Sequence, residues 1–299
     1  MGTLNGAKFL AEQLDSLEAQ QHTNWRLIAS DDGSVDDTIS ILRRYQAKWG
    51  AERLEIRRGP ARGFSNNFLS LACDGTIQAD LYAYCAQDDV WQPEKLSVAV
   101  DYLKAQRKTK LPYVYCGRTE YVSETLKPVG YSPMFVYPRS FRNALVQSIA
   151  GGNTMVFNQQ TKSLLEKAGQ VEVAAHDWWT YLLVKAAGGK VYYDQAPHIL
   201  YRQHPDAVIG GNTSKLARFD RLKWLLLGRF KSWNDMHVAA LQKNHDLMTE
   251  SSLETLDQFV RIRGSHLFHR FRMLDVCGLY RQSWRGTLSF YLAALLKKI

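Results

Sequence analysis

Apolar runs of three to six residues alternate with amphipathic stretches over the first two thirds of this chain. The runs at residues 25–30, 54–56, 81–86, 113–115, 191–193 and 199–204 have the length of buried strands. Between them, apolar residues recur at helical spacing, as at Phe9, Leu10, Leu14 and Leu17. Strands that alternate with helices predict an α/β domain, in which helices flank a mostly parallel central sheet.

From residue 215 onward the pattern changes to helical stretches that interleave Arg and Lys with Leu, Phe and Trp. We therefore divide the chain into an α/β domain, residues 1–212, and a basic, amphipathic C-terminal helical region, residues 213–299. This region has two interpretations. It is an appendage with solvated basic faces, or a peripheral membrane surface with cations at anionic headgroups and aromatic residues at the interface.

Two adjacent carboxylates, Asp88 and Asp89, end the apolar run at residues 81–86, and Pro93 then starts a helix. In a parallel α/β sheet, ligands bind beyond the carboxyl ends of the strands. Adjacent carboxylates at such a position repel each other and lose solvation. This cost is tolerated when a cation neutralises them or when the hydroxyl groups of a ligand donate hydrogen bonds to them. The alternative is a solvated turn in which Asp88 caps the helix.

A second strand end is also acidic, because residues 25–30 run into Asp31, Asp32, Gly33 and Ser34. One such end can be turn chemistry alone. Two of them in one α/β region favour a cleft that suits the ribose hydroxyls of a nucleotide and the Mg²⁺ or Mn²⁺ on its pyrophosphate. The sequence contains neither G-x-G-x-x-G nor G-x-x-x-x-G-K-[ST], so it supports neither a Rossmann dinucleotide site nor a P-loop.

Net charge and cysteine content restrict the possible binding partners less than the acidic strand ends do. A formal net charge of +9 indicates an anionic partner, which nucleic acid, anionic lipid and a sugar nucleotide all satisfy. The four cysteines have no CxxC spacing, which disfavours a zinc site or a disulfide framework and favours a reducing cytoplasm. No nucleic-acid recognition motif is present, so nucleic acid is not expected as a partner.

The segments TLNGAKFLAEQLDSL, SDDGSVDDT, QDDVW, GGNTMVF, AHDWW and YRQH occur in this order. In order and spacing they resemble a family-two inverting glycosyltransferase of the GT-A fold. The likeness is strongest to bacterial rhamnosyltransferases that build O-antigen or other cell-surface polysaccharides, and it covers roughly residues 1–212.

The resemblance implies roles for the acidic strand ends and for the segments around them. Asp31 with Asp32 would read the base and ribose, Asp88 would reach the ribose or donor sugar, and Asp89 would hold Mg²⁺ or Mn²⁺. The further nucleotide-sugar contacts would be Thr3, Asn5, Gly63, Asn67 and Arg202. Gly152 and Asn153 would lie under the sugars, and His204 is a second candidate metal ligand.

Asp177 opens a helical stretch beside Trp178 and Trp179, so it is either a helix N-cap or a catalytic base. An acid flanked by aromatic rings is desolvated, which raises its pKa and suits proton transfer near neutral pH. Indole faces are also platforms for the C–H faces of a sugar. The resemblance puts Asp177 at the position of the base.

The beginning of the chain departs from the family pattern. The family has a central strand just before the position of Thr3 and Asn5, and this sequence starts inside that motif. We therefore expect the first strand to be missing, either because the start codon is misassigned or because the sheet lacks it. A missing central strand would leave unpaired edges.

The function that follows is metal-dependent transfer of a sugar from a nucleotide-diphosphate donor, dTDP-L-rhamnose by resemblance, to a glycan or lipid-linked glycan. The alternatives are an N-terminally truncated, inactive transferase and a non-catalytic, basic membrane-binding or nucleic-acid-binding protein. Lipid-linked acceptors favour a cytoplasmic protein held at the inner face of the cytoplasmic membrane, where an anionic surface meets the C-terminal helices.

Overall fold

The computed structural model describes residues 1–106, 109–149, 151–204 and 228–299. The predicted boundary at residues 212 and 213 lies outside these residues, as does the first part of the helical region. The strands are β1 (Gly2–Thr3), β2 (Leu27–Asp31), β3 (Leu54–Arg58), β4 (Leu81–Ala83), β5 (Val90–Trp91), β6 (Tyr113–Gly117), β7 (Glu120–Val122), β8 (Pro128–Tyr131), β9 (Val156–Asn158), β10 (Lys190–Asp194) and β11 (Ile199–Arg202).

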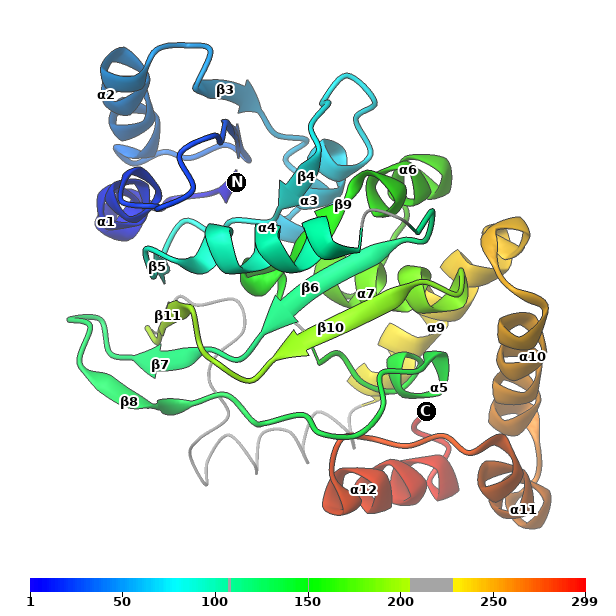
Figure 1. Ribbon diagram of the computed structural model, residues 1–299. Coiled ribbons are helices and arrows are strands. Elements are labelled where there is room, and N and C mark those ends of the chain that lie inside the picture. The colour runs from blue at the N-terminus through cyan, green and yellow to red at the C-terminus, as the bar shows by residue number, and fades with distance from the viewer. Residues whose placement is uncertain (107–108, 150, 205–227) are drawn as a thin grey trace.

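Helices flank these strands, as Figure 1 shows. In the first two thirds they are α1 (Ala7–Glu18), α2 (Thr38–Trp49), α3 (Phe64–Ala72), α4 (Lys95–Ala105), α5 (Phe141–Ala144), α6 (Gln159–Ala168) and α7 (His176–Ala186), with the 3-10 turn η1 (Gly152–Thr154). The C-terminal part contains α9 (Arg229–Lys243), η2 (His245–Leu247), α10 (Glu250–Gly264), α11 (Leu267–Cys277) and α12 (Trp284–Leu295). The α/β prediction is therefore confirmed.

The strands form three hydrogen-bonded groups, in the orders β1-β2-β3, β10-β6-β9-β4 and β5-β11-β7-β8. The first group is parallel throughout, but β9 runs antiparallel to both β6 and β4. A backbone bond from Gly2 N to Cys85 O (3.3 Å) joins the first group to the chain just after β4. The central sheet is thus mixed, where the sequence pattern predicts a mostly parallel one.

The expectation of a missing first strand is wrong in one respect, because a two-residue strand is present. Gly2 pairs with Ser30 and Thr3 with Asp31 in parallel register. The edge of β2 is therefore covered, and the end of β1 lies beside the acidic end of β2.

The polar, proline-bearing stretch at residues 119–139 is not one continuous loop. It contains the antiparallel hairpin β7–β8, and β7 also pairs in parallel with β11. Residues 133–139 follow this hairpin and lead into α5.

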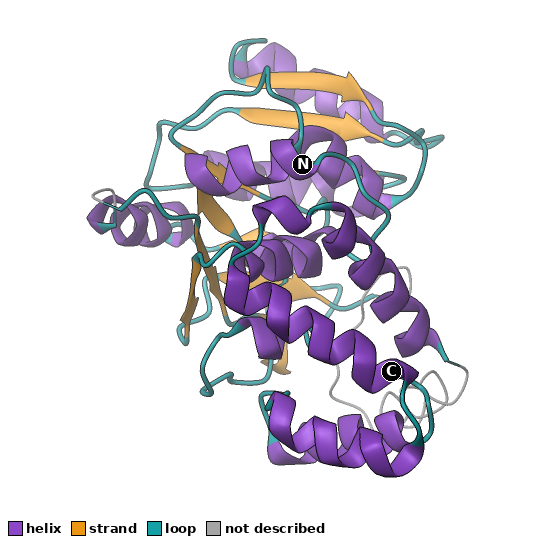
Figure 2. Ribbon diagram, turned by 90° about the vertical axis from the view of Figure 1, so that its right-hand side faces the viewer, coloured by secondary structure: helices purple, strands orange, loops and turns teal. Residues whose placement is uncertain are grey.

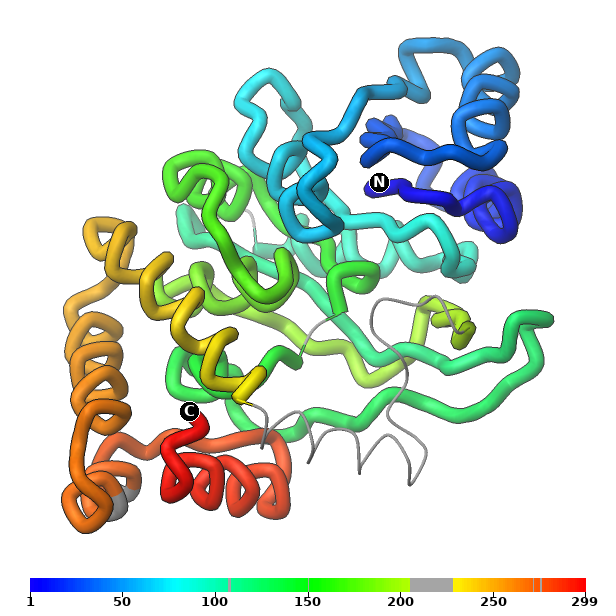
Figure 3. The backbone as a smooth tube through the Cα atoms, turned by 180° about the vertical axis from the view of Figure 1, so that it is seen from behind, coloured from blue at the N-terminus to red at the C-terminus, as the bar shows by residue number. Residues whose placement is uncertain are grey.

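Two main hydrophobic clusters stabilise the fold. One joins α1, α2, β2 and β3 through residues such as Leu14, Leu42 and Leu54. The larger one surrounds α7, in which ten of the eleven residues are buried, and it includes Val238, Phe259 and Phe290 from the C-terminal helices. These helices therefore share a core with α7. They lie at the opposite end of the molecule from α1 and α2 (Figure 3).

Candidate active site

The end of β2 is held by the turn that follows it and by β1. Asp31 Oδ1 accepts hydrogen bonds from Thr3 Oγ1 (2.9 Å) and Ser34 Oγ (2.5 Å), and its Oδ2 accepts from Ser34 N (2.9 Å). Asn5, at φ 49°, accepts from Val35 N (2.9 Å) and donates its own N–H to Ser34 Oγ (2.8 Å). The predicted contacts Thr3, Asn5 and Asp31 thus belong to one network.

Asp32 anchors the basic, glycine-rich loop before α3. Its Oδ1 accepts from Ala61 N (2.7 Å) and its Oδ2 accepts from Gly63 N (3.0 Å). Gly63 has φ +88°, a left-handed conformation that side chains rarely adopt. The carboxylate therefore fixes the cationic loop against the end of β2, and this is a role that the turn chemistry of DDGS does not reveal.

Asn67 is 2% exposed and its side-chain amide is engaged by one neighbour. Its Nδ2 donates to Ser30 O (2.8 Å), and its Oδ1 accepts from Ser30 Oγ (2.5 Å). The expectation that Asn67 contacts a nucleotide is therefore corrected. Asn67 instead holds Ser30, near the end of β2, through two hydrogen bonds.

Gln87, which the sequence analysis does not single out, connects the two acidic strand ends. Its Oε1 accepts from Leu4 N (2.8 Å) and its Nε2 donates to Leu4 O (3.0 Å). The side chain thus forms a two-bond clamp between the residue after Thr3 and the residue before Asp88. The signal that could have found it is its place directly before the two carboxylates.

Asp88 faces the end of β11 and caps no helix, since the N-cap of α4 is Glu94. Its Oδ2 lies 2.9 Å from Nε2 of His204. The ring of His204 lies 4.9 Å from that of Phe9. The predicted candidates Asp88 and His204 are therefore brought together, as partners of each other.

Asp89 is completely buried, and Asn153 is its hydrogen-bond partner. Asn153 Nδ2 donates to Asp89 Oδ2 (2.7 Å), whereas Asp89 Oδ1 makes no hydrogen bond with a described residue. Burial, and secondly the charge of Asp88, raise the pKa of Asp89 well above its usual range. The buried Lys95 ammonium lies 3.3 Å from the centroid of the Trp91 ring and attracts the charged form of Asp89.

Asp177 is the second residue of α7, and the N-cap of that helix is Ala175. Its Oδ2 accepts from Gly152 N (2.9 Å), and its Oδ1 accepts from Trp178 N (2.6 Å). Burial raises the pKa of Asp177 to about 6, although these two hydrogen bonds oppose the shift. A carboxyl with this pKa is deprotonated at neutral pH and can accept a proton.

Gly152 and Asn153 connect Asp177 to Asp89 through one 3-10 turn. Gly152 donates to Asp177 and Asn153 donates to Asp89. A Cβ atom at Gly152 would lie 2.5 Å from His176 Nε2, so a side chain does not fit there without displacing the histidine. Adjacent residues of η1 therefore set the relative positions of the two buried acids.

Tyr201, inside the YRQH segment, lies among these acids. Burial raises its pKa first, and the charges of Asp89, Asp88 and Asp177 add to the shift. The charges of Asp89 and Asp177, which are 88 positions apart in the chain, thus act on one phenol. The residue pattern favours Arg202 and His204 in this segment and does not indicate the tyrosine.

Arg202 is fully buried and supports the site from within. Its Nε donates to Asp88 O (3.0 Å), one terminal nitrogen donates to Glu124 O, and the other bonds to Glu12 Oε2 (2.6 Å). The expectation that Arg202 contacts a leaving diphosphate is therefore corrected. Its donors hold the loop of Asp88 and the end of β7.

Trp178 and Trp179 are core residues, so their indole faces are not available as the predicted platform for a sugar. They are 6% and 0% exposed. Trp178 donates to Ala144 O (2.7 Å) and packs against His237 of α9 at 4.6 Å between ring centroids. The AHDWW segment lies at the start of α7. Both of its indole rings are buried because other elements of the fold cover this helix.

The residues around Asp89 fit a divalent cation of the kind that sugar nucleotides carry. Asp89 Oδ1 is a buried acceptor that no described residue satisfies, and Mg²⁺ in such sites takes one or two carboxylates together with substrate phosphates. In the described ranges no three His, Cys, Asp or Glu side chains form a metal-binding group. His204 contacts Asp88, and no contact with Asp89 supports it as a second ligand.

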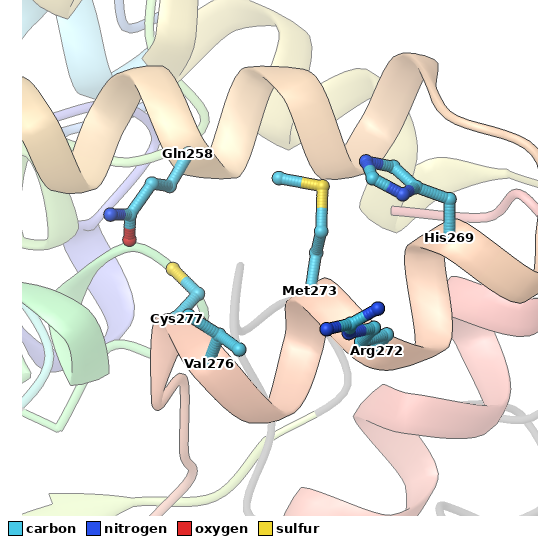
Figure 4. Close-up of a pocket in the computed structure, with 6 residues that line it drawn as sticks. All are labelled: Gln258, His269, Arg272, Met273, Val276 and Cys277. Carbon is cyan, nitrogen blue, oxygen red and sulfur yellow. The ribbon is translucent and has the colours of Figure 1, made fainter.

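A cavity lies elsewhere, between α10 and α11. It has a volume of about 210 Å³ and is lined by Gln258, His269, Arg272, Met273, Val276 and Cys277, whose side chains Figure 4 shows. None of the predicted site residues lines it.

The described strands, with their acidic carboxyl ends and flanking helices, form an α/β fold of the GT-A type. Two solved structures share the fold at 15% identity. The S. aureus TarS 1–349 complex with UDP-GlcNAc has a TM-score of 0.52, covering 97% of this chain and 90% of that one. The Pyrobaculum calidifontis mannosyltransferase PcManGT in complex with GDP-Man and Mn²⁺ has a TM-score of 0.51, covering 99% and 85%.

The family model "Glycosyl transferase family 2" matches residues 1–165, more than half of the chain. The chain therefore belongs to glycosyl transferase family 2. Among curated relatives, the dTDP-rhamnosyl transferase RfbG of Shigella flexneri is 26% identical over 236 residues, which cover 74% of this chain and 78% of the relative. The putative glycosyltransferase EpsE of Bacillus subtilis is 29% identical over 110 residues, covering 36% and 38%.

Proposed function

We propose that this glycosyltransferase moves L-rhamnose from dTDP-L-rhamnose to a glycan or lipid-linked glycan, with inversion at the anomeric carbon. The donor is supported by the similarity to RfbG over three quarters of the chain. The acceptor and the setting, synthesis of O-antigen or another cell-surface polysaccharide, are supported by the motifs that resemble rhamnosyltransferases.

The observation that carries the mechanism is the link between two buried acids. Asp89 and Asp177 bond to adjacent residues of η1, Asn153 and Gly152. A donor held at the first carboxylate would lie within reach of a base at the second. This geometry suits one in-line displacement, in which no covalent intermediate forms and no protein nucleophile is needed.

The donor would bind beyond the ends of β1 and β2. Asp31 is proposed to read the base and ribose, with Asp32 holding the basic loop before α3 beside them. Asp88 would accept from the hydroxyls of the ribose or donor sugar, and Gln87 keeps its loop next to Leu4. A cationic loop at the N-terminus of α3 favours an anionic diphosphate.

Asp89 would hold the divalent cation, Mg²⁺ or Mn²⁺, through its unsatisfied oxygen. When bound, such a cation supplies Lewis-acid neutralisation of the charge on the leaving diphosphate. Asp177 accepts the proton of the acceptor hydroxyl as that oxygen attacks, and its raised pKa leaves it in the basic form at neutral pH.

The proposed place of action is the inner face of the cytoplasmic membrane, where lipid-linked acceptors are present. Among the described residues no helix is both long and apolar enough to cross a bilayer. Attachment would therefore be through a surface of the protein, and the C-terminal helices supply the basic and apolar residues for it.

The donor assignment is tested by measuring release of nucleoside diphosphate from the purified full chain with MnCl₂. The donors are dTDP-L-rhamnose, UDP-GlcNAc and GDP-mannose, and each is offered together with glycan and lipid-linked glycan acceptors. We expect turnover with dTDP-L-rhamnose to exceed turnover with the others. Faster turnover with another donor would replace rhamnose in the proposal, and salt-dependent oligonucleotide binding without turnover would favour a non-catalytic basic protein.

A further inference from the structure

An apolar stripe runs along the outer side of α12. Trp284, Leu288, Leu292 and Leu296 are 66%, 52%, 51% and 56% exposed. Their spacing of four residues places them on one side of the helix and its C-cap. Phe290, Ala293 and Ala294, on the other side, are buried in the main core. Both sides of α12 are therefore apolar, but only one of them is covered.

The neighbouring helix extends this surface. α11 packs against α12, as Figure 2 shows from the side of the C-terminal helices. Leu267 and Phe268, at the start of α11, are 52% and 93% exposed. Single exposed apolar side chains are ordinary, but several of them on helices that pack together favour an interaction surface.

The charge around this surface is strongly positive. Residues 260–299 contain eight Arg and Lys and a single acid, Asp275, which gives this segment a formal charge of +7 out of the chain's +9. Arg261, Arg272, Arg285 and Lys297 are exposed.

Arginines elsewhere in the segment have internal partners, so the exposed cations are distinct from the structural ones. Arg270 is buried and donates to Ile262 O (3.0 Å) and Ala294 O (2.8 Å), and Arg263 pairs with Asp235. Arg285, in contrast, lies at the surface with its guanidinium 5.2 Å from the centroid of the Trp284 ring.

The surface adjoins a segment that leads from the active site. The Gln282 side chain accepts from Tyr137 N (2.9 Å) and donates to Tyr137 O (3.1 Å), and Tyr280 Oη donates to Pro138 O (2.6 Å). Residues 133–139 continue from the β7–β8 hairpin, whose strand β7 pairs with β11 just before His204. The segment before α12 is thus connected, through residues 133–139 and the β7–β8 hairpin, to the strand that leads to His204.

We propose that the outer faces of α11 and α12 form a docking surface for an anionic lipid bilayer. Trp284, Leu288 and Leu292 insert at the boundary of headgroups and acyl chains, while Arg285 and Lys297 contact anionic headgroups. A second copy of the same face would bring like charges together, which disfavours self-association. The use of this surface to meet a lipid-linked acceptor rests on the proposed function, whereas the binding itself does not.

The test is flotation of the full chain with vesicles rich in phosphatidylglycerol and with vesicles of phosphatidylcholine alone. We expect the wild type to bind only the anionic vesicles, and added salt to weaken binding. Trp284→Ser with Leu288→Ser should weaken it by about tenfold or more, because two apolar side chains leave the bilayer. Arg285→Gln with Lys297→Gln should weaken it by roughly tenfold.

The matched control is Val129→Ser on β8, which removes an equally exposed apolar side chain (54%) away from these helices. Its binding should equal that of the wild type. Absence of wild-type binding, equal binding to both vesicle types, or a Trp284→Ser effect on self-association in place of vesicle binding would each overturn the proposal. The assay contains no sugar donor, so failure of the glycosyltransferase assignment leaves its result unchanged.

Discussion

The acidic edge of the sheet and the outer face of α11 and α12 are built in opposite ways. At the first, Asp31, Asp32, Asp89 and Asp177 are each at most 9% exposed, and partners from other segments hold them. At the second, apolar side chains are exposed and have basic neighbours. Buried polar groups need satisfied partners to be tolerated, whereas an amphipathic helix face needs only its own periodicity.

Substitutions in the two regions should therefore have different effects on the fold. A change in the acidic edge disturbs several segments at once, because each carboxylate or guanidinium bonds to residues distant in sequence. A change on the outer face of α12 removes a side chain that the fold does not use.

Asp177→Asn should lower sugar transfer by roughly 10³-fold, because it removes the base that accepts the acceptor proton. The measurement is initial rate of nucleoside diphosphate release with acceptor present, and the control is Asp257→Asn, at an exposed position of α10. Unchanged turnover in Asp177→Asn would refute the base assignment.

The wild-type rate should also depend on pH in a defined direction. The pKa of Asp177 is raised to about 6, so the carboxylate is lost, and the rate falls, as pH decreases through that value. We expect the acidic limb of a plot of log kcat/KM against pH near 6, because kcat/KM reports the pKa of the free enzyme. A limb near 4 would mean that Asp177 is not desolvated in the working enzyme.

Arg202→Gln should destabilise the protein by about 3 kcal/mol, because it removes a fully buried guanidinium and leaves Asp88 O, Glu124 O and the half-exposed Glu12 carboxylate without their donor. Chemical denaturation measures the change. Arg261→Gln, on the exposed side of α10, is the matched control and should change the free energy of unfolding by less than about 0.5 kcal/mol. Similar values for both variants would contradict the supporting role of Arg202.

Asn153→Ala should destabilise by about 1–2 kcal/mol, because Asp89 loses its hydrogen bond in a buried site. The same variant should weaken the shift in Tm that MnCl₂ with dTDP produces, since the carboxylate is no longer oriented. Asn66→Ala serves as the control, because Asn66 is also half-buried but bonds only within its own segment, to Arg62 O (3.0 Å). An unaltered Tm shift would show that Asn153 does not position Asp89.

Leu288→Ser should change the free energy of unfolding by less than about 0.5 kcal/mol, because the side chain is already half exposed. Thermal or chemical denaturation of the full chain measures it. Phe290→Ser on the buried side of the same helix should cost about 3 kcal/mol or more. A large loss in Leu288→Ser would mean that the outer face of α12 packs against part of the chain.

Periodicity and motif order were enough to predict the α/β class, the helices and the acidic strand ends. These features are local, because a strand run, a turn or a helical spacing can each be recognised within a window of about ten residues. The same local information predicts that α12 is a helix, but it does not show which of its two apolar sides is buried.

The partners of each polar group depended on the tertiary structure. The sequence around Arg202 does not indicate that Glu12 is its partner. The AHDWW segment likewise does not indicate that helices from the end of the chain cover Trp178. The order of residues determined which side chains stand at the ends of strands, and only packing decided which of them remain open to a ligand. The physical reason is that burial and hydrogen bonding are set by segments up to 190 positions apart, as between Glu12 and Arg202.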